Sequence, residues 1–265
     1  MNFIQPSIDP VIFSISFLEV RWYSLAYIFG LLIGLYMMKR LNNLIRDNLI
    51  SNSLIDSFFI WAVFGIIIGG RIGYVFFYQT NSVIENPIFI FEIWKGGMSF
   101  HGGLIGIIVS MILFSKVYKI KFYYLSDLVS TVAPLGLFLG RITNFINTEL
   151  IGRPTEFYIS VVYPSIDNIP RHPSQLYEAV FEGLLLFVIL NFYFFKTKDL
   201  NNYGFISGLF LSLYSIFRFF IEFLREPDSQ IGLYFNFISM GQILSIPMFI
   251  FGTYLIFYYA KKRKN

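Results

Sequence analysis

Long apolar runs, separated by short polar segments, make up most of this chain. Seven of these runs approach the roughly 20 residues that a helix needs to cross a bilayer. We expect spanning helices over Phe17–Met38, Leu54–Tyr78, Met98–Phe114, Leu125–Ile146, Leu176–Phe195, Phe205–Leu224 and Ile238–Tyr259. The pattern therefore predicts an all-α membrane bundle of about seven transmembrane helices.

Basic residues gather after every second predicted helix. Twelve of the 20 Lys and Arg residues follow helices one, three, five and seven, namely Lys39, Arg40, Arg46, Lys116, Lys119, Lys121, Lys196, Lys198, Lys261, Lys262, Arg263 and Lys264. The opposite loops hold Arg21, Lys95, Arg153, Arg171 and Arg225. Because cytoplasmic loops carry the excess of positive charge, we expect a periplasmic N-terminus and a cytoplasmic C-terminus.

The longest polar segment, residues 147–175, falls on the predicted outer side. It contains Pro154, Pro164, Pro170 and Pro173, so the pattern predicts a small periplasmic cap without a long helix. No internal repeat or linker is visible, and we expect residues 1–265 to form a single integral-membrane domain. The missing repeat also disfavours a transporter built from two related halves.

Composition agrees with a membrane protein. The chain is 56% hydrophobic and 14% charged, whereas soluble domains are about a quarter charged. The net charge of +4 is concentrated at the predicted helix ends. No basic run interleaves with polar residues as in nucleic-acid-binding surfaces, so we expect the membrane as a partner and no nucleic acid.

Three places in the sequence combine charged or polar groups with predicted spans, where such groups usually face a cavity. In helix six, Tyr214, Arg218 and Glu222 follow at i, i+4 steps and share one face, with Arg225 close behind. One interpretation is an ion pair between Arg218 and Glu222 that hides charge from lipid. The other is a cationic wall of a polar cavity, in which Glu222 orients Arg218.

The second place is the outer end of helix four, Gly140–Gly152. Arg141 and Asn144 are i, i+3 neighbours there, and Asn147 and Glu149 follow. A helix C-cap explains asparagine and glycine, but it does not require an arginine and a glutamate as well. A guanidinium with amide donors nearby is suited to binding an anion.

The third place, Gly96–Gly106, opens helix three and contains His101, which is one of two histidines. His101 is either a hydrogen-bonded structural group or an imidazole that the adjoining glycines leave open to a ligand. The four-residue spacing of Gly102 and Gly106 predicts close helix packing. Gly65, Gly69 and Gly73 repeat with the same spacing and predict close packing of helix two as well. Arg71, between these glycines, is expected to make a polar contact inside the bundle.

Two further segments carry weaker signals. Trp22 and Tyr23 at the start of helix one are explained by an interfacial aromatic belt alone. In the segment Arg171–Glu178, His172 and Glu178 either line a cavity or lie at the interface.

Several chemistries are disfavoured. The chain has no Cys and two His, so it has no thiol nucleophile and no thiolate or His-x-x-x-His zinc site. Walker, dinucleotide and Gly-x-Ser-x-Gly motifs are absent from the sequence. We therefore expect no metal and no cofactor.

Six motifs together resemble the signature of the bacterial phosphatidylglycerol–prolipoprotein diacylglyceryl transferases. They are Gly69–Tyr74, Gly97–Gly103, Gly140–Gly152, Arg171–Gln175, Phe217–Arg225 and Ile238–Gln242. The resemblance extends from about Asp9 to Tyr259, and the order and spacing of the motifs are highly specific. Two features depart from the pattern, because Thr143 stands where Gly or Ala is usual and segment 147–175 is shorter than in many relatives.

The resemblance implies an activity. Such an enzyme moves the diacylglyceryl group of phosphatidylglycerol onto the lipobox cysteine of prolipoprotein signal peptides and releases glycerol 1-phosphate. This is the first step of lipoprotein maturation, at the periplasmic side of the bacterial inner membrane. The substrate supplies the thiol that reacts as a thiolate, in agreement with an enzyme that has no cysteine.

The resemblance also implies roles for individual residues. Arg141 and Arg218 would stabilise charge on the departing phosphate, and His101 is the candidate base. Two unpaired guanidiniums in one cavity would repel each other, which predicts a lipid phosphate between them. The implied substrate-binding residues are Arg141, Asn144, Glu149, Gly152, Tyr23, Tyr214 and Glu222.

Two other classes of function stay open. A transporter or channel would explain arginines inside spans, but predicts broken helices in related halves. A scaffold or receptor would use the same charges only as structural ion pairs, and would not need them concentrated toward one face of the membrane.

Overall fold

The computed structural model describes residues 3–15, 18–45, 49–197, 203–227, 232–234 and 237–262. The chain divides into two compact units. Unit 1 comprises Met1–Met38 and Asp127–Asn265, and unit 2 comprises Lys39–Ser126. The division falls within two continuous helices, α1 (Trp22–Leu44) and α5 (Phe122–Ile146).

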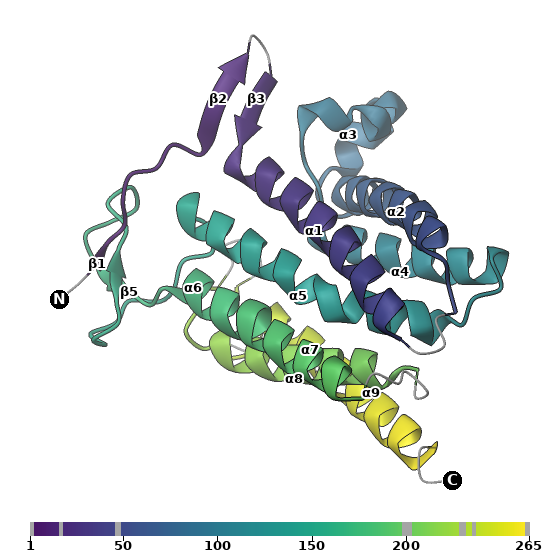
Figure 1. The fold of residues 1–265 in the computed structure, drawn as a ribbon. Coiled ribbons are helices and arrows are strands. Elements are labelled where there is room, and N and C mark those ends of the chain that lie inside the picture. Colours follow the sequence, from purple (N-terminus) through teal and green to yellow (C-terminus); the bar gives the residue numbers. More distant parts are fainter. Residues whose placement is uncertain are drawn as a thin grey trace. The chain divides into compact units, whose positions relative to one another are not determined.

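The C-terminal helices belong to unit 1. One continuous helical rod consists of α6 (Ser174–Glu178), the π-helical segment η3 (Ala179–Leu185) and α7 (Leu186–Thr197). Two further helices, α8 (Phe205–Ile221) and α9 (Met240–Lys262), pack against each other (Figure 1). Their close approach needs glycine, because a Cβ added at Gly208 would lie 2.8 Å from the carbonyl oxygen of Gly252.

A buried carboxylate joins the start of α8 to α5. Asp127 of α5 is fully buried and accepts hydrogen bonds from the backbone nitrogens of Gly204 and Ser207, each at 2.8 Å, and from Ser207 Oγ at 2.6 Å. The two backbone nitrogens are among the donors that a helix N-terminus leaves unpaired. Asp127 therefore caps α8 from a neighbouring helix and fixes α8 relative to α5.

Short strands form the non-helical part of unit 1. Strand β4 (Val161–Val162) pairs in parallel with β1 (Phe3–Ile4) and antiparallel with β5 (Pro170–Arg171). A separate hairpin joins β2 (Val11–Ile15) to β3 (Leu18–Arg21). Residues 147–175 thus contain no long helix, as the four prolines predicted.

The segment before α6 is fastened to that helix by buried polar contacts. The hydroxyl of Tyr163 is buried and donates to Gln175 Oε1 at 2.9 Å, and burial raises the pKa of Tyr163 to about 12. On the surface, Arg171 Nη2 lies 2.6 Å from Asp167 Oδ2, and this hydrogen-bonded ion pair lowers the pKa of the Asp167 carboxyl.

Unit 2 is built on the packing of α2 (Asn52–Tyr78) against α4 (Phe100–Val117). A Cβ added at Gly69 would lie 2.3 Å from the carbonyl oxygen of Gly102, and one at Gly106 would lie 1.9 Å from that of Gly65. The two backbones therefore touch where side chains would keep them apart. This confirms the packing interpretation of both glycine patterns.

The connection between α2 and α4 contains α3 (Thr80–Glu85) and two 3₁₀ segments, η1 (Pro87–Phe91) and η2 (Ile93–Lys95). Arg71 of α2 is buried and donates to four carbonyl oxygens of this connection, those of Phe89 at 2.6 Å, Ile90 at 3.1 Å, Gly96 at 2.5 Å and Gly97 at 3.4 Å. The charge inside unit 2 thus anchors the segment that leads into α4.

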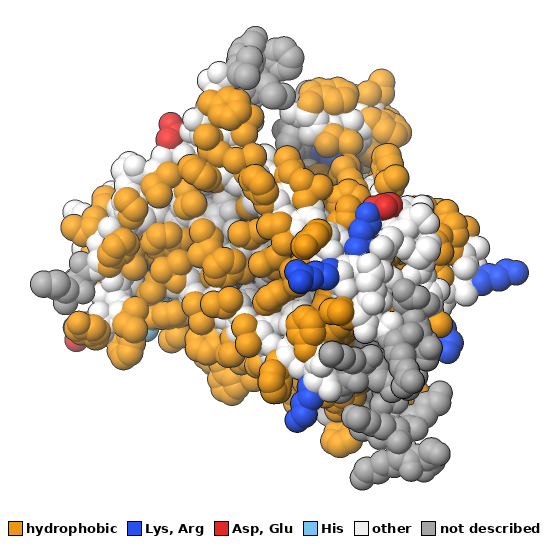
Figure 2. Space-filling view, in the orientation of Figure 1, with side chains coloured by type: hydrophobic (Ala, Val, Ile, Leu, Met, Phe, Trp, Pro, Cys, Tyr) orange, Lys and Arg blue, Asp and Glu red, His pale blue; other side chains and the backbone are white. Residues whose placement is uncertain are grey.

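The predicted helix bundle is confirmed. Among the described residues, six helical stretches are long and apolar enough to cross a membrane, namely Trp22–Leu44, Asn52–Phe77, Phe100–Val117, Phe122–Ile146, Ser174–Lys196 and Met240–Tyr259. The remaining apolar helix, Phe205–Ile221, is shorter. Figure 2 shows apolar side chains over much of the visible surface, as expected where helices face lipid. The chain is a multi-pass membrane protein.

Several predicted boundaries were wrong. The first helix starts at Trp22, because residues 18–21 pair as a strand instead, and it continues to Leu44. The predicted start, Phe17, lies outside the described residues. The sixth helix ends at Ile221 rather than Leu224, and the π-helical segment was not predicted.

The orientation in the membrane stays a prediction. Four of the twelve basic residues behind it lie outside the described residues, namely Arg46, Lys198, Arg263 and Lys264. Among the others, Lys39 pairs with Asp56 of unit 2, with Nζ 2.5 Å from Oδ1.

Candidate active site

Six charged side chains meet in unit 1 where α5, the α6–η3 rod and α8 come together. This Arg–Glu cluster consists of Arg141, Arg218, Arg225, Glu178, Glu182 and Glu222. The Glu178 and Glu182 side chains have no exposed surface, whereas those of Arg141 and Arg218 are 15% and 11% exposed. Buried ions are tolerated when they are paired, and this cluster pairs three cations with three anions.

Two carboxylates bridge the two central arginines. Arg141 Nη1 lies 3.2 Å from Glu178 Oε2, and Arg141 Nη2 donates to Glu182 Oε2 at 3.2 Å. Arg218 Nη1 donates to Glu178 Oε1 and lies 3.7 Å from Glu182 Oε1. Arg218 Nη2 also lies 2.6 Å from Glu222 Oε2. Each bridging carboxylate thus contacts a guanidinium from α5 and one from α8.

This pairing corrects the argument made from the sequence. Arg141 and Arg218 lie together as expected, but they are not unpaired, because Glu178 and Glu182 already supply the anions between them. The ion pair between Arg218 and Glu222 is present, yet it is one part of a larger arrangement. Sequence reasoning missed Glu182, although its i, i+4 spacing from Glu178 within an apolar run was a usable signal.

Two residues complete the surroundings of the cluster. Tyr214, one turn before Arg218 on α8, interacts electrostatically with Arg141 and with both bridging glutamates. Arg225 follows α8, and its Nη1 lies 3.9 Å from both Glu178 Oε1 and Glu222 Oε2.

The loop after α5 holds a carboxylate between amides. Asn144 Nδ2 donates to Glu149 Oε2 at 2.8 Å, and Asn147 Nδ2 donates to Glu149 Oε1 at 3.3 Å. The backbone of Glu149 is fixed in turn, because the buried Gln175 donates from Nε2 to its carbonyl oxygen at 2.6 Å. Asn144, three residues after Arg141, is therefore joined to Glu149 by a direct hydrogen bond.

Gly152 lies where three backbone segments cross. A Cβ at this position would lie 2.1 Å from the carbonyl oxygen of His172. Gly152 also forms a β-bridge with Arg225, and its carbonyl oxygen accepts from Arg171 Nη1 at 3.2 Å. A side chain at this position would collide with His172. Glycine therefore allows the loop after α5 to pack against His172 while it pairs with Arg225.

The remaining two predicted site residues lie at helix starts. Tyr23 is exposed near the N-terminus of α1, with its hydroxyl oxygen 3.4 Å from that of Tyr27, and it interacts electrostatically with Glu149 and Arg141. His101 is the second residue of α4 in unit 2, where its exposed ring contacts that of Phe100, with 5.7 Å between centroids. His101 and the Arg–Glu cluster therefore belong to different compact units.

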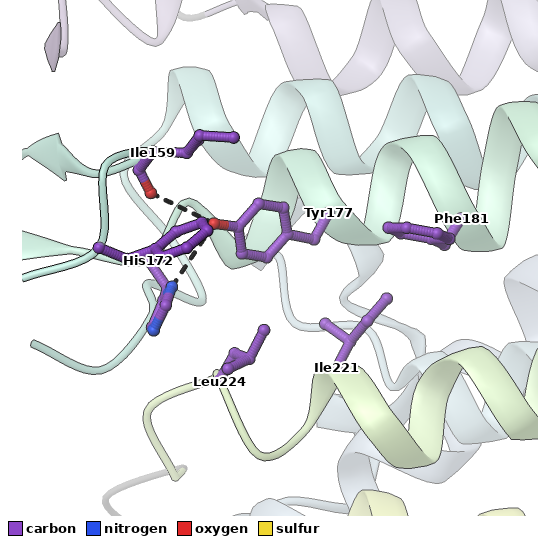
Figure 3. Close-up of a pocket in the computed structure, with 7 residues that line it drawn as sticks. Ile159, His172, Tyr177, Phe181, Ile221 and Leu224 are labelled. Carbon is purple, nitrogen blue, oxygen red and sulfur yellow. Dashed lines mark hydrogen bonds between the residues drawn. The ribbon is translucent and has the colours of Figure 1, made fainter. Parts of the chain in front are cut away.

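An apolar pocket of about 370 Å³ shares the α6–η3 rod and α8 with the cluster. It is lined by Phe157, Ile159, His172, Tyr177, Phe181, Ile221 and Leu224 (Figure 3). The hydroxyl of Tyr177 lies at one side, where it donates to the carbonyl oxygen of Ile159 at 3.3 Å and lies 3.5 Å from His172 Nδ1. His172 thus lines a cavity, and burial lowers the pKa of its imidazole.

The pocket and the cluster alternate along the chain. Tyr177, Phe181 and Ile221 line the pocket, and each immediately precedes a glutamate of the cluster. Since adjacent residues on a helix point in different directions, these elements present an apolar surface beside a charged one. The arrangement is suited to a molecule that has a charged group and an apolar part.

Known proteins match nearly the whole of this chain. The sequence profile of the family described as prolipoprotein diacylglyceryl transferase matches residues 10–258. The chain belongs to this family. It is 50% identical over 251 residues to the phosphatidylglycerol–prolipoprotein diacylglyceryl transferase of Rickettsia felis, covering 95% of this chain and 96% of that protein. It is 49% identical over 253 residues to the protein of that name from Rickettsia typhi, covering 96% and 97%.

Membership of the diacylglyceryl transferase family confirms the resemblance seen in the motifs. The structure adds how the motifs are held in unit 1. Gly140–Gly152 supplies Arg141 and the loop with Glu149, Arg171–Gln175 fastens that loop, and Phe217–Arg225 supplies the other two arginines of the cluster.

Proposed function

We propose that this protein transfers the diacylglyceryl group of phosphatidylglycerol to the thiol of the lipobox cysteine of prolipoproteins and releases glycerol 1-phosphate. The observation that carries the proposal is the pair Arg141 and Arg218, partly buried and drawn from two helices beside an apolar pocket. Planar guanidiniums suit a phosphodiester, and the pocket suits an apolar part of a substrate. The family and its named relatives support the same reaction.

The reaction assigns a task to each group. The cysteine sulfur forms a bond to the glyceryl carbon, the bond from that carbon to the phosphate oxygen breaks, and its electron pair stays on the phosphate. Arg141 and Arg218 stabilise the charge that develops on that oxygen. The thiol proton must leave for the sulfur to attack as a thiolate, and His101 is the proposed acceptor.

The other predicted residues shape the binding site. Asn144 and Glu149, joined at 2.8 Å, provide polar groups for the glycerol head group, as do the hydroxyls of Tyr23 and Tyr214. Gly152 fixes the backbone of this loop. Glu222 orients Arg218, in agreement with their contact of 2.6 Å.

Location and organisation are part of the proposal. We place the protein in the bacterial inner membrane with the cluster toward the periplasm, because the basic residues predict that orientation. Residues 1–265 act as one integral-membrane domain, with 147–175 as a periplasmic cap. Its partners are phosphatidylglycerol, prolipoprotein signal peptides and the membrane, and the reaction uses no metal, cofactor or nucleic acid.

A second function is favoured by the neutrality of the cluster. Three arginines paired with three glutamates would also suit a structural scaffold that binds no phosphate. The two proposals differ in what the purified protein does with lipid and thiol.

The deciding experiment uses the purified protein in phosphatidylglycerol vesicles with a lipobox peptide. We expect release of glycerol 1-phosphate and a gain of one diacylglyceryl group by the peptide. A peptide with serine in place of cysteine is the control and should give no release. If the folded, unsubstituted protein releases no detectable glycerol 1-phosphate, the transferase function is rejected and the scaffold is favoured.

A further inference from the structure

Glu182 is the bridging carboxylate with the weakest hold. Its Oε2 accepts from Arg141 at 3.2 Å, and its Oε1 lies 3.7 Å from Arg218 Nη1 without any hydrogen bond. Glu178, by contrast, contacts all three arginines of the cluster. Glu222, at the C-terminal cap of α8, lies 2.6 Å from Arg218. Glu182 is therefore the one anion of the cluster whose departure breaks no contact shorter than 3.2 Å.

The backbone around Glu182 is also unusual. Glu182 lies in the π-helical segment Ala179–Leu185, which interrupts the rod between α6 and α7. Such segments are rare and occur frequently at functional sites. The next residue, Gly183, packs against α5, because a Cβ there would lie 2.6 Å from the Cβ of Phe138. The rod is thus fixed to α5 beside Arg141 while its hydrogen-bond pattern is irregular at Glu182.

Charge balance defines what happens when a phosphate arrives. The cluster pairs three arginines with three glutamates. A phosphodiester adds one negative charge, so it competes with a carboxylate for the same guanidinium donors. Cleavage turns the phosphodiester into a phosphate monoester, which carries about −1.5 to −2 charges at neutral pH. The competition between phosphate and carboxylate therefore becomes stronger once the product has formed.

We propose that Glu182 is an internal counter-anion that gives up Arg141 to the lipid phosphate and takes it back to expel glycerol phosphate. This inference rests on the proposed transferase function. It makes Glu182 a positioning residue that opposes phosphate binding. A carboxylate that merely orients Arg141 would have the opposite effect, because its loss would weaken phosphate binding.

The experiment compares Glu182→Gln with the unsubstituted enzyme, using glycerol 1-phosphate as the inhibitor. We expect the inhibition constant of glycerol 1-phosphate to fall about tenfold, the size of one charge-assisted contact. The KM for phosphatidylglycerol should fall and kcat should fall with it, because product leaves more slowly. Glu226→Gln, which removes the exposed carboxylate 3.4 Å from Arg171, is the control and should change none of these three values.

A second variant and a second measurement keep the test decisive. Glu182→Asp replaces Glu182→Gln in the test if the latter does not fold. Aspartate keeps the charge but is too short to bridge both arginines, so this variant should also lower the inhibition constant. Thermal unfolding in detergent should show that glycerol 1-phosphate raises Tm more in either variant than in the unsubstituted protein. An inhibition constant that is unchanged or higher in the folded variants would overturn the inference. If the unsubstituted protein shows no transfer activity, the proposed transferase function is rejected instead. The Tm comparison would still decide the role of Glu182.

Discussion

Arg141 and Arg218 contact the same two carboxylates but are held differently. Both ionic partners of Arg141 come from the α6–η3 rod, whereas Arg218 has an additional partner, Glu222, at the C-terminal cap of α8. Removing one member of a buried charge pair typically costs about 3–5 kcal/mol. Substitution to a neutral residue would therefore mix a loss of stability with any loss of catalysis, and a charge-preserving substitution is the cleaner test.

We predict that Arg141→Lys and Arg218→Lys each fold but lower the transfer rate by about 10²-fold, the usual cost of one lost transition-state donor. Lysine keeps the charge but cannot offer the two parallel donors of a guanidinium to one phosphate. The double variant should lose less than the product of the two single losses, because both arginines act on one group. Transfer assays and thermal unfolding in detergent measure the two effects separately.

Arg40→Lys, at an exposed position on α1, is the control for this pair and should retain full activity. Strictly multiplicative losses in the double variant would mean that the arginines do not share a phosphate. Unfolding of both lysine variants would favour the scaffold.

A separate prediction concerns the base. His101→Gln should lower the transfer rate by about 10²–10⁴-fold at neutral pH, the span of general base catalysis. The defect should shrink as pH rises toward about 8.5, where a free thiol loses its proton without help. Transfer rates of both proteins between pH 6.5 and 9 give the measurement. A defect of constant size over this range would assign His101 a positioning role instead.

At this scale, part of the site was visible in the sequence. Arg141, Arg218 and Glu222 stood out because charged residues are costly in apolar runs, and the i, i+4 spacing correctly joined Arg218 to Glu222. The pairing of Arg141 with Glu178 and Glu182 was not predictable. It depends on how the α6–η3 rod lies against α5, and no local pattern encodes that.

At the scale of elements, the contact between α2 and α4 depends on the absence of side chains. We predict that Gly106→Ala lowers the thermal stability of the protein, because the added Cβ would lie 1.9 Å from the carbonyl oxygen of Gly65. Overpacking of this kind costs about 1–3 kcal/mol. Thermal unfolding in detergent is the measurement.

Gly136→Ala in α5 is the matched control for this substitution. A Cβ at Gly136 meets no atom of the described chain within 4 Å, and alanine is favoured over glycine inside a helix by up to about 1 kcal/mol. This control should therefore leave stability unchanged or raise it. Equal unfolding temperatures for the two variants would show that α2 and α4 can separate without loss.

Elements differed in how well the sequence predicted them. The glycine spacing predicted the helix contact because it records a local requirement for close approach. The strand Leu18–Arg21 was instead assigned to the first helix, since its pairing with β2 is a tertiary contact. The π-helical segment was missed for a related reason, because its apolar sequence is equally compatible with an ordinary α-helix.

At the scale of the whole molecule, the distribution of lysine and arginine predicts the topology. A reporter fused after residue 264 should be active in the cytoplasm, and one inserted near Asp167 should be active outside it. The reason is the excess of basic residues after alternate helices. Paired reporters that are active on opposite sides of the membrane provide the measurement. Finding both positions on the same side would exclude an odd number of spans between them and the proposed orientation.

The Arg–Glu cluster also has a consequence for how the protein is made. Its charges enter the membrane in sequence order, Arg141 first, then the two bridging glutamates, and the last three members with or just after α8. A chain interrupted before α8 holds two carboxylates against one guanidinium, and an unmatched charge is costly in hydrocarbon. The cluster becomes neutral only once α8 and Arg225 are in place. A truncated chain therefore carries an unpaired carboxylate in the membrane. Membrane proteases could recognise such chains by the instability that this charge causes.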